Sequence, residues 1–134
     1  MGKSIVIVAG SYHKNHIEKM VDEARAVALD NDLIVEEVKW VPGSMEMPLQ
    51  IKRLFLRESI DGAIVLGIIE KGETEHGLVM GKSVIMALID LQLASMKPIG
   101  FGIIGPGAKP EHIKDRLLPY AKNSVLAVKE MLSN

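Results

Sequence analysis

The sequence predicts an α/β fold, a single domain in which four parallel strands form a doubly wound sheet flanked by helices. Three of the four strand candidates are continuous apolar runs, which is the pattern of strands buried on both faces of a parallel sheet. Strand and helix candidates alternate strictly along the chain, and this order implies right-handed crossovers. The chain has 134 residues, enough for one compact core and too few for two ordinary domains. We therefore expect residues 1–134 to form one domain.

The elements follow from the spacing of apolar residues. The expected strands are Ser4–Ala9, Leu33–Val41, Gly62–Ile69 and Pro98–Ile104. The second of these alternates in polarity more than the others, which favours a position at an edge of the sheet. The expected helices are His16–Asp30, Met45–Glu58, Gly77–Met96 and Pro110–Leu132. Ligands of such folds bind beyond the carboxyl ends of the strands, where the loops are Gly10–His13, Val41–Glu46, Ile68–His76 and Gly105–Ala108.

The third helix is apolar nearly all round. A helix of this kind must be buried on more than one side, and the sheet of so small a chain can cover only one face. Polar residues interrupt the segment Leu78–Met96 too often for a convincing membrane span. We therefore expect a second subunit on its free face, and hence a homo-oligomer with no membrane partner.

The last helix carries a clean apolar stripe that should face the core, made of Ile113, Leu117, Ala121, Val125, Val128 and Leu132. Pro119 interrupts this segment and predicts a kink or a break into two short helices. Arg116 and Lys122 lie off the stripe. Because of this break, the sequence does not fix where the Arg116 side chain points.

The amino-acid composition limits the kinds of ligand and partner that the protein can bind. Sixteen Lys and Arg residues balance seventeen Asp and Glu residues, so no basic excess points to nucleic acid or an anionic membrane. The absence of cysteine excludes disulfides, thiolate catalysis and cysteine-based metal sites. His13 and His16 are spaced to share a helical face, but no third ligand is evident nearby, so we expect no metal. No export signal pattern precedes the first strand, and we expect a cytoplasmic location.

The segment Gly67–His76 is the strongest functional signal. An apolar strand ends here in a polar loop that delivers His76 to the start of a helix. Free N–H groups at a helix N-terminus favour an anion, and an imidazole can move protons near neutral pH. This pattern predicts a phosphate site with a proton-transfer group beside it, although Glu73 and Glu75 bring negative charge to the same loop.

Three segments in one βα register resemble the 6,7-dimethyl-8-ribityllumazine synthases, particularly the short archaeal-type members. They are Val41–Pro48, Gly67–His76 and Gly102–Gly107. The resemblance implies a flavodoxin-like fold and a condensation of 5-amino-6-(D-ribitylamino)uracil with 3,4-dihydroxy-2-butanone 4-phosphate. That reaction gives the lumazine precursor of riboflavin, phosphate and water. It implies a transferase with two small-molecule substrates, no cofactor, and functional coupling to riboflavin synthase.

The resemblance also implies roles for individual residues. His76 matches the proton-transfer histidine, and Tyr12 matches an aromatic residue that stacks on the pyrimidine. The ribityl and ring pocket would be lined by Ser44, Met45 and Glu46, and the pyrimidine would meet the backbone of Ile68, Ile69 and Glu70. Glu73, Thr74 and Arg116 match phosphate-binding positions. Phe101, Arg116 and Lys122 match groups that the family supplies from the adjacent subunit.

The sequence departs from the family at one place, and two alternative functions remain. The family usually has Phe-Asn where this chain has Tyr12 and His13, which puts the local geometry in question. The competing functions are an archaeal-type riboflavin synthase, disfavoured because its substrates bring no phosphate to the loop, and a non-enzymatic flavin- or lumazine-binding module. A pentamer, a decamer and an icosahedral shell of sixty subunits stay open.

Overall fold

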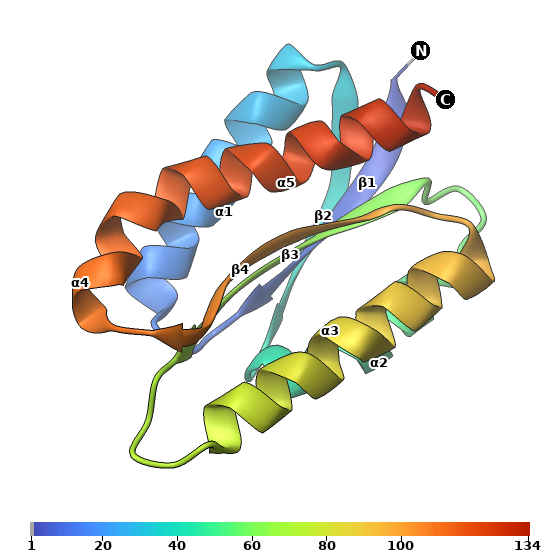
Figure 1. The fold of residues 1–134 in the computed structure, drawn as a ribbon. Coiled ribbons are helices and arrows are strands. Elements are labelled where there is room, and N and C mark those ends of the chain that lie inside the picture. Colours follow the sequence, from blue (N-terminus) through green and yellow to red (C-terminus); the bar gives the residue numbers. More distant parts are fainter. Residues whose placement is uncertain (1) are drawn as a thin grey trace.

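Four parallel strands form one sheet with helices on both faces. The computed structural model describes residues 2–134, so Met1 lies outside it. The strands β1 (Lys3–Gly10), β2 (Leu33–Val41), β3 (Gly62–Glu70) and β4 (Ile99–Ala108) take the order β2-β1-β3-β4. Helices α1 (Lys14–Asp30) and α5 (Leu117–Leu132) cover one face, and α2 (Met47–Phe55) and α3 (His76–Ser95) cover the other (Figure 1). The predicted doubly wound α/β fold is confirmed.

The sheet separates two hydrophobic cores because successive side chains of a strand point to opposite faces. Ile5, Ile7 and Ile64 belong to the core beneath α1 and α5. Val6 and Val8 belong to the core beneath α2 and α3. Burial on both faces is the reason why these strands read as unbroken apolar runs.

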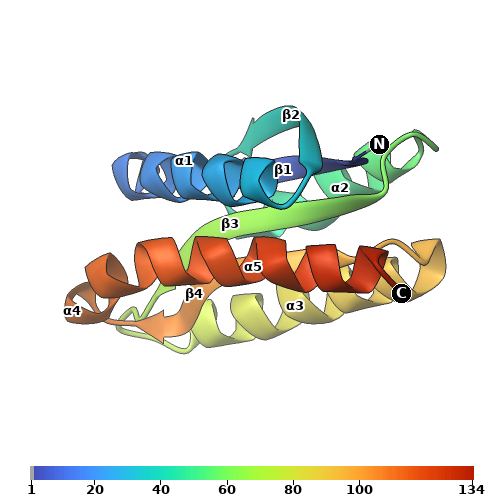
Figure 2. The same ribbon diagram turned by 90° about the horizontal axis from the view of Figure 1, so that it is seen from above.

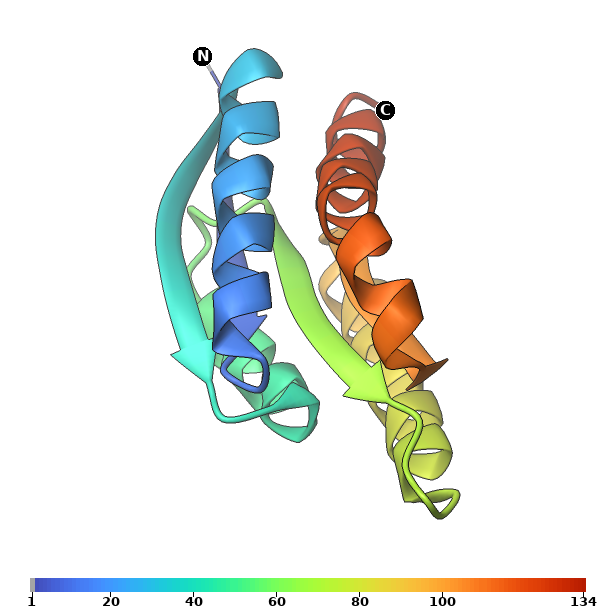
Figure 3. The same ribbon diagram turned by 90° about the vertical axis from the view of Figure 1, so that its left-hand side faces the viewer.

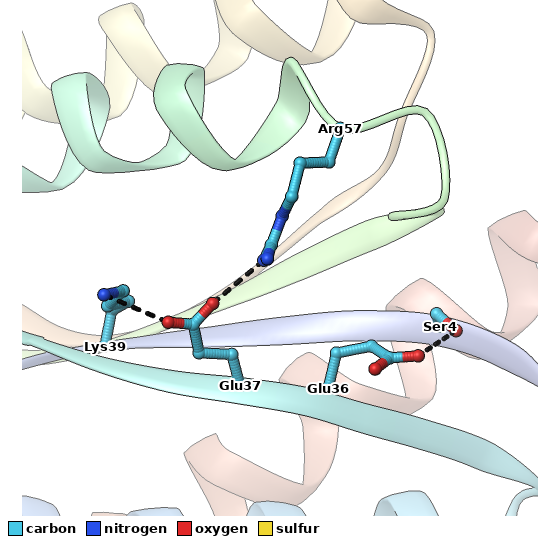
Figure 4. Close-up of polar contacts among 5 residues, drawn as sticks. All are labelled: Ser4, Glu36, Glu37, Lys39 and Arg57. Carbon is cyan, nitrogen blue, oxygen red and sulfur yellow. Dashed lines mark hydrogen bonds and ion pairs between the residues drawn. The ribbon is translucent and has the colours of Figure 1, made fainter.

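Strand β2 lies at an edge of the sheet, as its alternating sequence predicts. Its exposed face carries charged side chains, which discourage pairing with another chain. The Glu37 carboxylate bridges Lys39 and Arg57 at 3.0 and 2.9 Å, and the Ser4 hydroxyl donates to Glu36 (Figure 4). The hydrogen bond from Lys39 is the main cause that lowers the pKa of Glu37. These contacts join the edge strand to β1 and to the end of α2.

The prediction of a kink or break at Pro119 is wrong in position. The chain breaks earlier, where α4 (Pro110–Ile113) passes into the 3₁₀ turn Lys114–Arg116, and α5 then runs unbroken for 16 residues. Pro119 is the third residue of α5 and lies in its first turn. A proline is tolerated there because the N–H groups of a first turn have no partner within the helix.

Helix α5 packs directly against the backbone of β4. A methyl group at Gly100 would lie 2.8 Å from the carbonyl carbon of Ser124, and one at Gly102 would lie 3.4 Å from the Ser124 hydroxyl oxygen. Ser124 is buried, and its hydroxyl donates to the carbonyl of Ala121 within the same helix. Gly100 therefore sets the distance between helix and sheet, whereas the tightest contact at Gly102 would be with the Leu66 Cδ2 of the neighbouring strand, at 2.6 Å. The stripe expected to face the core is buried from Ile113 to Val128.

Helix α3 leaves most of its apolar surface uncovered. Only Gly81, Val84 and Leu88 are buried, whereas Met86 is 58% and Leu93 70% exposed. By length and composition alone α3 could cross a membrane, but one such helix is weak evidence because helices of soluble proteins pass the same test. The sheet thus covers one face of α3, as expected, and much of the other face is left exposed.

The carboxyl ends of the strands meet at one end of the molecule. Figure 2 shows α1 and α5 side by side over the sheet, and Figure 3 shows the loops that follow β1, β2 and β3 gathered at the end opposite the chain termini. The strand order reverses between β1 and β3, because the connections from these two strands run to opposite sides. Folds of this kind bind ligands at that point.

Candidate functional site

A cavity of about 520 Å³ opens at the carboxyl ends of β1, β2 and β3. This volume is within the range of small-molecule sites. Three loops form its walls, and the lining residues are Gly10, Tyr12, Pro42, Gly43, Ser44, Met45, Glu46, Gly67, Ile68, Ile69, Glu70, Gly72, Thr74, His76, Gly77 and Met80. The cavity lies where the strand order reverses.

The floor of the cavity depends on a close approach between β3 and the segment after β2. A methyl group at Gly67 would lie 3.0 Å from the Met47 Cε and 3.2 Å from the Ser44 Oγ. Ser44 and Met47 are buried, and the 3₁₀ turn Ser44–Glu46 leads into α2 with Pro48 in its first turn. The turn leaves Met45 and Glu46 exposed at the cavity. Glycine at position 67 of β3 thus lets the Ser44 and Met47 side chains pack beneath the cavity.

The wall after β3 ends at a helix start. Thr74 accepts a hydrogen bond at 3.3 Å from the backbone N–H of His76, the first residue of α3. His76 is exposed and lines the cavity beside Gly72 and Thr74. The first turn of α3 contains no acidic residue. Its backbone N–H groups and the helix dipole therefore favour an anion next to the imidazole.

The acidic residues of this loop lie outside the cavity lining. Glu73 and Glu75 are exposed, and only their neighbours Gly72, Thr74 and His76 contribute to the wall. Water can screen both carboxylates, which reduces their repulsion of an anion. The negative charge noted in the sequence is compatible with a phosphate at the helix start.

Tyr12 and Glu70 form the wall between β1 and β3. The Tyr12 hydroxyl donates to the Glu70 Oε2 at 3.3 Å, and the His13 Nε2 contacts the Glu70 Oε1. The negative charge of Glu70 is the main cause that raises the pKa of Tyr12 above its ordinary value. The tyrosine therefore stays protonated at neutral pH and can donate. Glu70 offers its backbone to the cavity while its side chain contacts two residues after β1.

The structure brings nine of the thirteen predicted site residues together. They are Tyr12, Ser44, Met45, Glu46, Ile68, Ile69, Glu70, Thr74 and His76. The other four lie outside this cavity: Glu73, Phe101, Arg116 and Lys122. Phe101 is partly buried on β4 and packs against the core beneath α2 and α3. Lys122 is exposed on α5.

Arg116 lines a separate, smaller hollow of about 230 Å³ beside the loop Gly105–Ala108, His112 and Tyr120. Its guanidinium donates to the carbonyl of His112 at 2.9 Å. The fourth strand-end loop therefore does not share the main cavity with the other three. Within one subunit, Arg116 stands apart from His76.

Several residues at or beside the cavity were not predicted from the sequence. Met80 lines the cavity one turn after His76, and the spacing of four residues on a helix could have indicated this. Pro42 and Gly43 lie in a loop that was expected at the site, but only Ser44 onward was assigned. His13 was noted as a departure from the family, and its contact with Glu70 across two strands has no sequence signal. Within residues 2–134, no group of three His, Asp or Glu side chains is placed to hold a metal ion.

Comparisons with known proteins identify the family of this chain. A family model described as 6,7-dimethyl-8-ribityllumazine synthase matches residues 2–134. A protein of Metallosphaera sedula with that name is 37% identical over 127 residues, which are 95% of this chain and 83% of the relative. A protein of Staphylothermus marinus with the same name is 33% identical over 87% of this chain and 75% of its own length. Another of Saccharolobus solfataricus is 34% identical over 90% of this chain and 79% of its own length. The chain belongs to the 6,7-dimethyl-8-ribityllumazine synthase family.

Proposed function

We propose that this protein condenses 5-amino-6-(D-ribitylamino)uracil with 3,4-dihydroxy-2-butanone 4-phosphate, releasing phosphate and water. The observation that carries the proposal is the convergence of nine family-matched positions in one cavity, with His76 at a helix start. The riboflavin synthase and carrier alternatives are not favoured, because the matching relatives are named as the lumazine synthase.

The walls of the cavity suit the two substrates differently. Glu46 can accept hydrogen bonds from ribityl hydroxyls, and the Tyr12 ring can stack on a pyrimidine. Ile68 and Ile69 present backbone groups to that ring at the end of β3. The phosphate of the second substrate fits at the N-terminus of α3, where Thr74 adds a hydroxyl. The reacting carbons of both substrates would then lie next to His76.

The chemistry consists of proton transfers around a carbon–nitrogen condensation. Imine formation releases one water, elimination releases phosphate, and ring closure forms the second carbon–nitrogen bond and releases a second water. An imidazole at His76 can donate and accept protons at successive steps. Holding two substrates in one cavity removes much of the entropic barrier, so positioning contributes a large share of the rate. The protein supplies both effects with side chains and backbone groups alone.

The direct test is to mix the purified protein with both substrates and follow lumazine absorbance and fluorescence. We expect product formation that requires both substrates and releases one phosphate per lumazine. The Ser59→Ala variant is a suitable control, because Ser59 is exposed in the loop before β3 and lies outside the cavity lining. Absence of lumazine above the uncatalysed rate would overturn the proposal.

We also propose that the active form is a homopentamer, alone or as the unit of a decamer or an icosahedral shell, located in the cytoplasm. The uncovered face of α3 supports an interface, since Val79, Met86 and Leu93 are all more than half exposed. Phe101, Arg116 and Lys122 lie outside the cavity of their own subunit. A ring of identical interfaces would bring these residues to the next subunit's cavity. Native mass spectrometry reads the stoichiometry, and a fully active monomer would contradict the shared site.

A further inference from the structure

His13 adopts a backbone conformation that few side chains tolerate. Its φ of 59° and ψ of 46° place it in the left-handed region, immediately before α1. For a residue other than glycine this conformation is strained. It directs the imidazole from the end of β1 toward the end of β3, where its Nε2 meets the Glu70 Oε1.

Glu70 uses its two carboxylate oxygens on two neighbours. One oxygen contacts His13, and the other accepts the Tyr12 hydroxyl at 3.3 Å. The Tyr12 and His13 rings also touch edge to face, with centroids 4.3 Å apart and planes inclined by 61°. Tyr12 is 54% exposed, so few packing contacts hold its ring. Its orientation at the cavity therefore depends on these polar contacts.

We propose that His13 is a positioning residue, which holds the Glu70 carboxylate so that Glu70 in turn holds the Tyr12 ring against the cavity. The proposal deepens the proposed function and rests on the assignment of Tyr12 to the pyrimidine. Together His13, Glu70 and Tyr12 form a relay that links the ends of β1 and β3. Tyr12 and Glu70 are the members of the relay that line the cavity, and both are matched to the pyrimidine. The relay therefore acts on binding of the pyrimidine and not on the proton transfers at His76.

The neighbouring His16 offers a matched comparison. Its ring lies 6.0 Å from the His13 ring, on the next turn of the chain, and it makes no contact with Glu70. It also lies outside the lining of the main cavity. Replacing His16 therefore shows whether losing any histidine at the start of α1 changes binding.

The experiment compares His13→Asn, Tyr12→Phe, the double variant and His16→Asn with the wild type. Asparagine tolerates left-handed backbone better than most residues, so His13→Asn keeps the turn but is too short to reach Glu70. Tyr12→Phe keeps the aromatic ring and removes only the hydroxyl. Calorimetry gives the dissociation constant of 5-amino-6-(D-ribitylamino)uracil, and steady-state assays give kcat and both KM values. Circular dichroism confirms that each variant is folded.

We expect His13→Asn to weaken pyrimidine binding by about three- to tenfold, the size of one lost polar contact. Its kcat and its KM for the butanone phosphate should stay within about twofold of wild type. In the Tyr12→Phe background the His13→Asn change should add much less, because the hydroxyl that Glu70 holds is gone and only the ring-to-ring contact with His13 remains. His16→Asn should leave all constants unchanged.

Failure of this relay differs from failure of the proposed reaction. An active wild type whose pyrimidine affinity is unchanged by His13→Asn, or lowered equally in both Tyr12 backgrounds, overturns the relay alone. If the wild type binds the pyrimidine but shows no turnover, and the variants change that binding as expected, the relay is supported and the condensation is overturned. No pyrimidine binding by the wild type overturns both.

Discussion

Replacing Gly100 by alanine should push α5 slightly away from the sheet. The added methyl group would lie 2.8 Å from the carbonyl carbon of Ser124 and closer still to its oxygen, and 2.9 Å from the Ile64 Cδ1. Carbon atoms pack best at about 3.5–4.0 Å. The Ile64 side chain can rotate, but the Ser124 carbonyl is helix backbone and must move with α5. Relief of the overlap therefore requires a shift of the helix by about 1 Å.

The expected loss of stability follows from this overlap. Overpacking of a close contact costs about 1–3 kcal/mol. Unfolding entropy near Tm is about 2.1 cal/mol/K per residue, which for 134 residues converts that cost into a fall of about 4–11 °C. Circular dichroism melts at equal protein concentration measure it, since assembly makes Tm concentration-dependent.

A matched glycine gives the control. A methyl group at Gly72 would meet nothing within 4 Å, and Gly72 does not have the positive φ of Gly105 or Gly107. Gly72→Ala should therefore leave Tm unchanged or slightly higher. The reasoning fails if Gly100→Ala melts within about 1 °C of wild type, or if both variants lose the same amount.

The remaining predictions concern the site and the assembly. His76→Ala should lower the single-turnover rate by about ten- to a thousandfold, because substrate positioning survives the loss of the proton-transfer group, and an unchanged rate would remove His76 from the mechanism. Arg116→Ala should raise the KM for the butanone phosphate far more than the KM for the pyrimidine, since arginine binds phosphate through charge-assisted hydrogen bonds; equal effects would refute its assignment. Met86→Lys on α3 should dissociate the oligomer, as light scattering would show, whereas Met131→Lys, at 57% exposure on α5, should not; an intact Met86→Lys oligomer would exclude α3 from the interface. Glu70→Gln removes the negative charge that raises the pKa of Tyr12, so in a Tyr120→Phe background the phenol should lose its proton at lower pH than with Glu70 present; absorbance titration at alkaline pH measures this, and no shift would show that Glu70 does not act on Tyr12.

The order and type of the main elements could be read from local pattern. The apolar run of β3 is uninterrupted because both faces of that strand are covered, and the alternation of β2 reflects its edge position. The stripe of α5 has the spacing of a helix with one buried face. Each of these signals is repeated over many residues, which makes it robust to a single exception. Nine of the predicted site residues follow strand ends, where parallel topology makes them converge on one cavity.

The predicted position of the break was wrong because the effect of a proline on a helix depends on where in the helix it lies. Within a helix it removes a hydrogen bond and clashes with the preceding turn, whereas in a first turn it costs little. Which outcome applies depends on where the helix begins. That start is set at Leu117, where the buried stripe of α5 meets the core, after the 3₁₀ turn that ends at Arg116.

By itself, the sequence determined the α/β class, the strand-end location of the site and the excess of apolar surface on α3, because each depends on residue type and spacing along one element. Only the tertiary structure decided that Glu70 joins Tyr12 to His13, that Gly67 admits Ser44 and Met47 beneath the cavity, and that Arg116 stands apart from His76 within a subunit. Each of these facts joins residues from elements far apart in sequence. Such contacts depend on the distance and register between packed elements, and these are set by the volumes of all the side chains between them.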